Sequence, residues 1–171
     1  MIYLNIGSNL SSSSGSRQNN IESAITFLKD LDVKLIKISS FYETPSYPNK
    51  LDPKFINICI KLESKIKPIN FLNKMMEIEI KLGRTRLNKN EPRTCDIDII
   101  DFNGQVIKNE QLIIPHPKSH LRNFVIYPLK EIEPNWIHPI FNKKIDIFFL
   151  ELDKNSHNEI TRVGKSDILL T

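Results

Sequence analysis

The sequence predicts an α+β fold: a ferredoxin-like, split βαβ antiparallel sheet, with helices packed on one face and additional elements toward the C-terminus. The main observation is the order of the apolar patterns between Ile2 and Phe102, which read strand, helix, strand, strand, helix, strand. A second observation is that no internal repeat and no linker interrupts the 171 residues. We therefore expect one domain over residues 1–171.

Three elements are predicted in the first forty or so residues. The apolar run Ile2 to Ile6 predicts a buried strand followed by a turn at Gly7-Ser8-Asn9. Apolar residues spaced by three and four between Ile21 and Leu31 predict a helix capped by Ser16. Alternation from Val33 to Tyr42 predicts one further strand.

The next elements complete the expected sheet. Phe55 to Leu62 reads as a strand on which Phe55, Asn57 and Cys59 point to one face. A helix should begin at Pro68 and end at Gly83. The strand that carries Asp96 and Asp98 follows, and Asn103-Gly104 predicts a hairpin that pairs it with Gln105 to Ile107.

Toward the C-terminus the pattern becomes irregular. Pro128 and Pro134 should limit any helix in the apolar stretch Phe124 to Leu129. Ile145 to Leu152 predicts a third, terminal helix. The polar residues 153–171 predict a peripheral tail.

Composition and charge narrow the function classes. Hydrophobic residues make up 40% and charged residues 26% of the chain, and no apolar run is long enough to span a bilayer, so we expect no membrane role. The first residues lack the pattern of a secretory leader, which predicts a cytoplasmic location. A scattered net charge of +4 favours a small anionic ligand over nucleic acid. Cys59 and Cys95 lie in apolar runs, typical of buried reduced thiols.

Asp96 and Asp98 are the leading candidates for a metal site. They stand two residues apart on a predicted strand, so both should share one face. Carboxylates on a rigid face suit a hard cation such as Mg²⁺. The alternative is that they only keep an edge strand from pairing with another chain.

A basic loop runs directly into that strand and carries Arg84, Arg86, Lys89 and Arg93. Guanidinium groups clasp phosphate oxygens, so this loop together with a cation indicates a polyphosphate ligand. The alternative for Arg84 is a favourable contact with the negative end of the preceding helix. Glu79 could contact the nucleotide, or form a surface ion pair with Arg84.

Further candidate residues lie outside the basic loop and the strand that follows it. His116 lies between two prolines that fix its backbone, and its ring could donate to a phosphate or simply occupy a turn. Arg122 could supply another phosphate contact, and Phe124 either an aromatic wall or ordinary core. Asn57 shares a strand face with Phe55, so either that face is open or Asn57 binds something.

A family resemblance appears once these segments are read in order. LNIGSNL, SSFYETPSY, FINICIKLE, EIEIKLGRTR, EPRTCDIDIIDFNG, IPHP and RNFVIYPLKEIEP occur between Leu4 and Pro134. Their order and content resemble the 6-hydroxymethyl-7,8-dihydropterin pyrophosphokinases of folate biosynthesis. The resemblance rests most on PRTxDxD followed by IPHP.

The resemblance implies an enzyme that moves a pyrophosphoryl group from ATP to the pterin and releases AMP. It implies two Mg²⁺ ions on Asp96 and Asp98, and it assigns catalytic roles to these aspartates together with Arg84 and Arg93. The nucleotide contacts that it implies fall on Glu79, Arg84, Arg86, Arg93, His116 and Arg122. The pterin contacts fall on Thr44, Pro45, Phe55, Asn57 and Phe124. We expect a monomer with small-molecule substrates only.

Two departures from the family pattern bear on activity. Family members often have Trp-Gly before PRT, whereas this chain has Asn90-Glu91, which places an anion near the expected phosphates and opens the alternative of a degenerate enzyme that binds without turnover. Phe55 stands where Tyr is frequent, which keeps the stacking ring.

A third possibility is an RNA-binding sheet, because folds of this type also carry aromatics that stack bases.

Overall fold

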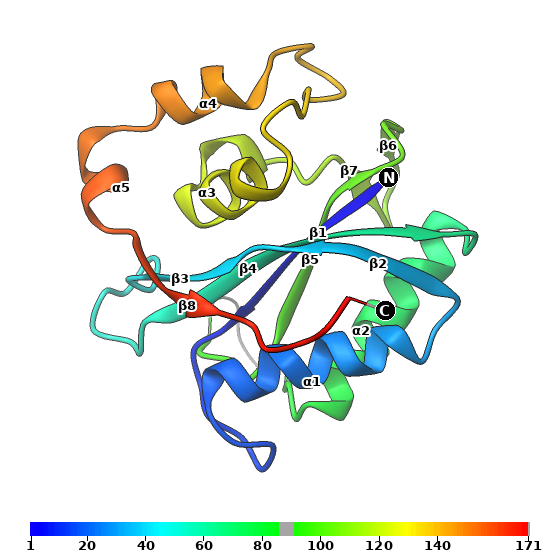
Figure 1. Cartoon of the computed structure of the whole chain (residues 1–171), viewed down its shortest axis with the longest axis vertical. Coiled ribbons are helices and arrows are strands. Elements are labelled where there is room, and N and C mark those ends of the chain that lie inside the picture. The colour runs from blue at the N-terminus through cyan, green and yellow to red at the C-terminus, as the bar shows by residue number, and fades with distance from the viewer. Residues whose placement is uncertain (86–90, 171) are drawn as a thin grey trace.

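An antiparallel six-stranded sheet organises the described residues, 1–85 and 91–170, of a computed structural model (Figure 1). Its strand order is β5-β1-β4-β3-β8, and β2 also pairs with β4. The strands are β1 (Ile2–Ser8), β2 (Val33–Ile38), β3 (Ser40–Thr44), β4 (Phe55–Ser64), β5 (Asp96–Phe102) and β8 (Thr161–Lys165). The α+β class and the antiparallel sheet are confirmed.

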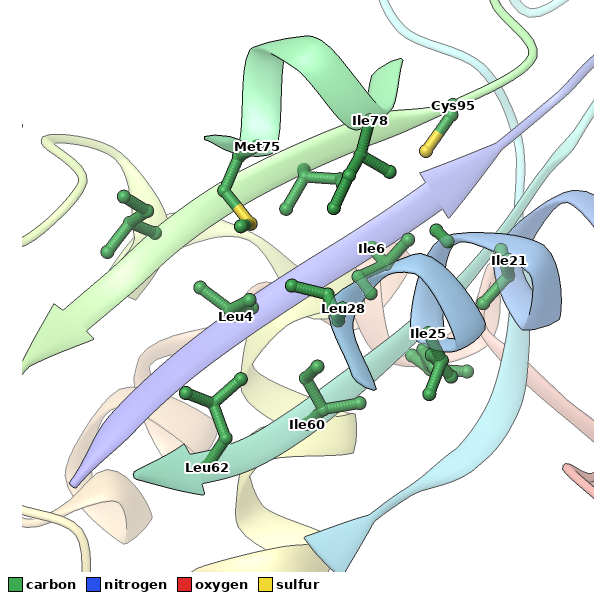
Figure 2. Close-up of a cluster of buried hydrophobic side chains, with 14 of the residues drawn as sticks. Leu4, Ile6, Ile21, Ile25, Leu28, Ile60, Leu62, Met75, Ile78 and Cys95 are labelled. Atoms are coloured by element: carbon green, nitrogen blue, oxygen red, sulfur yellow. The ribbon is translucent and has the colours of Figure 1, made fainter. Parts of the chain in front are cut away.

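Two helices cover one face of the sheet, as predicted. They are α1 (Arg17–Lys29) and α2 (Pro68–Lys81), and their apolar sides meet the inward residues of β1 and β4, such as Leu4, Ile6, Ile60 and Leu62 (Figure 2). Ser16 caps α1 by accepting from the Asn19 amide, and Gly83 follows α2 with a φ of +81°. This core fixes where the strands end.

The opposite face carries a second core. Helices α3 (Asn123–Ile132) and α4 (Ile145–Glu151) pack over Tyr3, Cys59 and Ile100. Both cysteines are buried free thiols, as expected. Helix α3 covers only part of this face, and the sheet end that carries Asp96 lies beyond it.

Two strand predictions were wrong. Gly7 and Ser8 belong to β1, because they pair with Asn57 and Ile56 of β4 instead of forming a turn. The expected single strand Val33 to Tyr42 is two strands. Ser39 separates them, since its hydroxyl accepts the Cys59 amide at 2.9 Å in place of a backbone carbonyl.

The predicted hairpin pairing after β5 was also wrong. Asn103 and Gly104 do turn the chain with positive φ values of 55° and 69°. The following strand, β6 (Ile107–Lys108), pairs with β7 (Ile113–Ile114). Ile107 therefore lies opposite Ile114 and not opposite a residue of β5.

The expectation that Pro128 and Pro134 limit any helix near Phe124 was correct for Pro134, since α3 ends at Ile132, and wrong for Pro128, through which the helix continues. A proline lacks the amide that would bond the carbonyl four residues earlier, here that of Phe124. The Asn5 amide, in the orientation that satisfies both of its polar atoms, donates to this carbonyl at 2.9 Å. A side chain of β1 thus replaces the missing helical bond.

The C-terminal region is more ordered than predicted. Helix α4 is present but is neither the third helix nor terminal, since α3 precedes it and α5 (Lys154–Asn158) follows it. Residues 161–165 form the edge strand β8, so the segment predicted as a peripheral tail extends the sheet. In the described ranges, no helix is both long and apolar enough to cross a membrane.

Candidate active site

Strand register brings the predicted residues to one end of one sheet face. Asp98 pairs with Asn5, and Asp96 pairs with Gly7. On the other side of β1, Gly7 pairs with Asn57. Paired residues of an antiparallel sheet point to the same face, so the aspartates and Asn57 share the face on which α3 lies. The prediction that Asp96 and Asp98 share a face is confirmed, with Ile97 and Ile99 in the opposite core.

Gly7 has no side chain, which leaves room between its two paired residues, Asp96 and Asn57. A Cβ at this position would lie 2.6 Å from Asn57 Oδ1 and 3.5 Å from the Phe55 ring. The first of these separations is shorter than real carbon contacts allow. A glycine at this position therefore gives the Asn57 amide its place beside β1.

Two arginines clamp Asp96. Arg84 Nη1 lies 2.6 Å from Oδ1, while Arg93 reaches Oδ2 with Nε at 2.9 Å and Nη2 at 2.7 Å. Burial opposes ionisation of Asp96, but the charges of Arg93 and Arg84 outweigh it and lower the pKa of this carboxyl below its usual value. Asp96 is therefore an anion in the described structure.

Asp98 lies in a different environment. Arg122 forms an ion pair with it, with Nη1 at 3.6 Å from Oδ2. Burial, followed by the neighbouring charge of Asp96, raises the pKa of Asp98 to about 7. Two carboxylates that repel each other in this way would be relieved by a bound cation.

Glu79 contacts both Arg84 and the start of β5. Only 2% of the residue is exposed, and its Oε1 accepts the Ile97 amide at 2.8 Å and also meets Arg84 Nη1. The alternative of a surface ion pair is therefore wrong, because the pair is buried. Glu79 fixes both the start of β5 and the guanidinium that reaches Asp96.

His116 is held in one tautomer. Its Nδ1 accepts the Lys118 amide at 3.2 Å, which leaves the proton of the neutral ring on Nε2. Burial, followed by the charge of Arg122, lowers the pKa of His116 to about 4. At neutral pH the ring is an uncharged donor.

Two aromatic rings and two buried polar atoms without partners lie on the elements beside the carboxylates, and we refer to this group of residues as the aromatic pocket. The guanidinium carbon of Arg93 lies 5.1 Å from the centre of the Phe55 ring, and that of Arg122 lies 5.4 Å from the centre of the Phe124 ring. Each ring is therefore in contact with a basic side chain. Among the described residues, Thr44 Oγ1 and Asn57 Nδ2 are buried without a hydrogen-bond partner. Pro45 follows Thr44 and is half-buried. Buried polar atoms without partners are rare, and a flat heteroaromatic ligand would satisfy them.

A comparison with known protein families matches the sequence of this chain to one of them. Residues 3–134 match the model described as 7,8-dihydro-6-hydroxymethylpterin-pyrophosphokinase (HPPK). This chain belongs to the HPPK family. The match covers every candidate residue named above.

Curated HPPK relatives span most of the chain. The pyrophosphokinase of Aquifex aeolicus is 37% identical over 147 residues, which is 86% of this chain and 89% of that protein. The enzyme of Bacillus subtilis is 37% identical over 131 residues, 76% of each chain. The HPPK assignment, with its pyrophosphoryl transfer to hydroxymethyldihydropterin in folate synthesis, rests on these matches.

Solved structures agree on the fold. The HPPK-DHPS protein of Plasmodium falciparum superposes with a TM-score of 0.70 at 16% identity, over 94% of this chain and 46% of that one. This chain therefore spans a little under half of that protein. At such low identity the likeness supports the α+β architecture alone.

Two residues that contact the candidate site were not singled out by sequence reasoning. Asn9 is 2% exposed; its Oδ1 accepts the Arg93 amide at 2.6 Å and its Nδ2 donates to the Pro53 carbonyl at 3.0 Å. Asn5 lies between Asn57 and Phe124, within 3.3 Å of the Asn57 amide. In the sequence, both could have been found as amide side chains inside or just after a predicted buried strand.

Some of the predicted loop lies outside the described residues. Arg86, Lys89 and Asn90 fall in the range 86–90, so their positions are not described. Glu91 is described, and its carbonyl accepts from Arg93 Nη1 at 3.1 Å. Predictions for Arg86 and for the Asn90-Glu91 departure therefore stay predictions.

Proposed function

We propose that this HPPK transfers the pyrophosphoryl group of ATP to the hydroxymethyl oxygen of 6-hydroxymethyl-7,8-dihydropterin and releases AMP. In this reaction a bond forms between that oxygen and the β-phosphorus, and the bond from the β-phosphorus to the bridging α-phosphate oxygen breaks. The observation that carries the proposal is the adjacency of a charged end, with Asp96 and Asp98, to a pocket where Thr44 and Asn57 present unpaired polar atoms.

The pterin is assigned to the aromatic pocket. Phe55 and Phe124 would stack its rings, while Asn57 and Thr44 would satisfy its amide edge and Pro45 would line the pocket. Asn5 supports this wall from β1, because its amide, in the orientation that satisfies both of its polar atoms, donates to the Phe124 carbonyl. The hydroxymethyl group would then face the aspartates.

The nucleotide is assigned to the basic end. Arg84 and Arg93 would shift from Asp96 to phosphate oxygens, and Arg122 and the Nε2–H of His116 would add donors. Arg86 is assigned here from the resemblance alone. Glu79 would keep Arg84 aimed at the phosphates and contact the nucleotide at its edge.

The residues present fit magnesium. Asp96 and Asp98 offer hard carboxylate oxygens on one face, and in the part of the chain that the structure describes no third His, Cys, Asp or Glu joins them. Mg²⁺ is commonly held by one or two carboxylates, with substrate phosphates and water completing its shell. We assign two Mg²⁺ ions to these aspartates, where they would neutralise charge on the transferring group.

The RNA-binding alternative is weaker. An RNA platform needs an open apolar or basic sheet face, whereas α3 covers part of this face and two carboxylates occupy the remaining end. We keep the monomer and the cytoplasmic location as predictions.

One experiment tests the proposal. The purified chain is incubated with ATP, Mg²⁺ and 6-hydroxymethyl-7,8-dihydropterin, and nucleotides and pterins are separated. We expect AMP and the pterin diphosphate in equal amounts, and neither product when EDTA replaces Mg²⁺. Formation of ADP would indicate a one-phosphate transfer, and binding of both substrates without AMP would indicate a degenerate enzyme.

A further inference from the structure

The segment 153–165 lies outside the residues that match the HPPK family model, 3–134, yet it attaches to both walls of the pocket. It comprises α5 (Lys154–Asn158) and β8 (Thr161–Lys165), and crosses from the start of α3 to the sheet edge (Figure 1). We refer to residues 153–165 as the strap.

The first attachment is at the start of α3. Asn123 Nδ2 donates to the Ser156 carbonyl at 2.7 Å, and Asn123 Oδ1 accepts the Phe124 amide at 2.7 Å. One turn further along, the Tyr127 hydroxyl lies 2.7 Å from His157 Nδ1. The strap thus holds the helical turn that carries Phe124.

The second attachment is at the opposite wall. Strand β8 pairs with β3, with Thr161 opposite Glu43, the residue before Thr44. Glu159 forms an ion pair with Lys50, which lies in the loop between Thr44 and Phe55. The strap therefore also holds the strand end and the loop that carry Thr44 and Pro45.

We propose that the strap is a positioning device for the pterin, and that Asn123 and Glu159 are its positioning residues. The inference rests on the proposed function. Phe124 and Thr44 come from elements more than seventy residues apart, and the strap joins these elements directly. Holding them at a fixed separation before the ligand arrives removes part of the ordering cost of binding.

The positions of the two attachments predict which substrate affinity changes when an attachment is removed. Asn123 and Glu159 contact the elements proposed to hold the pterin. The arginines proposed to bind phosphate have other supports, because Glu79 contacts Arg84 and Asn9 contacts Arg93. Both strap contacts are partly exposed, with 37% of the Glu159 side chain accessible, so they contribute little to global stability. The strap should therefore affect pterin affinity more than ATP affinity, because Arg122, which precedes Asn123, is the nucleotide group that lies next to an attachment.

Asn123→Ala and Glu159→Gln test this in the full chain. We expect the KM for the pterin, and the Kd measured by titrating it without ATP, to rise about three- to tenfold for Asn123→Ala, which loses a hydrogen bond, and by about two- to threefold for Glu159→Gln, which loses the charge of an exposed ion pair. The KM for ATP, kcat and Tm should change little. Asn158→Ala, on the exposed end of α5, and Glu110→Gln, on the exposed β6–β7 connection, are matched controls expected to behave as wild type.

The double variant tests whether the two attachments act together. If the strap transmits position only when both ends are held, the double variant should bind pterin about as weakly as the weaker single variant. Fold-changes that multiply, an unchanged pterin KM in both single variants, or equal losses for ATP and pterin would overturn the proposal. A wild-type chain that forms no AMP would instead contradict the proposed function, while the Kd titration would still test the strap.

Discussion

Asp96 and Asp98 stand on one face of β5 but in opposite electrostatic environments. Asp96 is clamped by Arg84 and Arg93 and has a lowered pKa, whereas Asp98 meets Arg122 at 3.6 Å and has a pKa raised to about 7. The pair thus combines a fixed anion with a carboxyl that ionises fully only when a cation or higher pH favours it.

Asp98→Asn should stabilise the metal-free protein at pH 8. The folded pKa of about 7 lies above the ordinary value of 3.8, so the folded state binds the extra proton and stability falls as pH rises from about 4 to about 7. Asparagine mimics the protonated form. We expect Tm at pH 8 to rise by about 2 to 4 °C, which corresponds to about 1 kcal/mol in a chain of this size. The gain should disappear at pH 4; a gain that is equal at both pH values would contradict the ionisation argument.

Glu79→Gln should destabilise the fold. The neutral amide removes the charge that Arg84 meets in a buried site, and its NH₂ group faces a guanidinium that cannot accept. We expect a loss of about 1 to 3 kcal/mol in the free energy of unfolding, measured by urea denaturation. Glu77→Gln, exposed on the same helix, is the matched control and should stay within about 0.5 kcal/mol of wild type.

Gly7→Ala should weaken pterin binding selectively. The new methyl group would lie 2.6 Å from Asn57 Oδ1, so the Asn57 amide must move from its place beside β1. We expect the KM for the pterin to rise about tenfold or more, because a misplaced polar group loses its bond to the ligand. The KM for ATP, measured in the same preparation, should change by less than about twofold. Equal losses for both substrates would point to a general disturbance of β1.

Asn9→Ala should weaken ATP binding. Asn9 Oδ1 accepts the Arg93 amide at 2.6 Å and so fixes the residue that is proposed to grip phosphate. We expect the KM for ATP to rise about three- to tenfold, the effect of one lost hydrogen bond. Asn9→Asp keeps the acceptor and should retain more of the ATP affinity. An aspartate variant that is no better than alanine would show that the contact with the Pro53 carbonyl matters more.

His116 and His138 should make the protein less stable in acid. Burial is the first cause that lowers the pKa of each ring to about 4, so both are neutral in the folded state. Unfolded histidines take up a proton near pH 6.5, so the contribution of each ring to stability should fall as pH drops from about 6.5 to about 4, opposite in direction to the contribution of Asp98. Urea midpoints across this range measure the effect. The His116→Gln and His138→Gln variants should each show a shallower fall than wild type.

Short-range patterns in the sequence predicted much of the fold. The period-two alternation placed Asp96 and Asp98 on one face with Ile97 opposite, and Ser16 and Gly83 marked helix ends. These features depend on neighbours within a few residues. For that reason they can be predicted before the tertiary structure is known.

Features that depend on distant partners could not be predicted. Ser39 splits a strand because its hydroxyl meets the Cys59 amide, and α3 tolerates Pro128 because Asn5 satisfies the carbonyl that the proline leaves free. Glu79 resembles a surface residue until β5 supplies the Ile97 amide beside it. Each of these contacts joins residues at least eighteen positions apart.

The central claim is that Asp98 is required for pyrophosphoryl transfer from ATP to the pterin. The most direct measurement is the initial rate of AMP release with ATP, Mg²⁺ and 6-hydroxymethyl-7,8-dihydropterin, for wild type and Asp98→Asn, with the exposed Asp167→Asn as control. We expect wild type and Asp167→Asn to release AMP equally, and Asp98→Asn to be slower by about 100-fold or more, since a group that neutralises transition-state charge is lost. AMP release by Asp98→Asn at a rate near that of wild type would contradict the account.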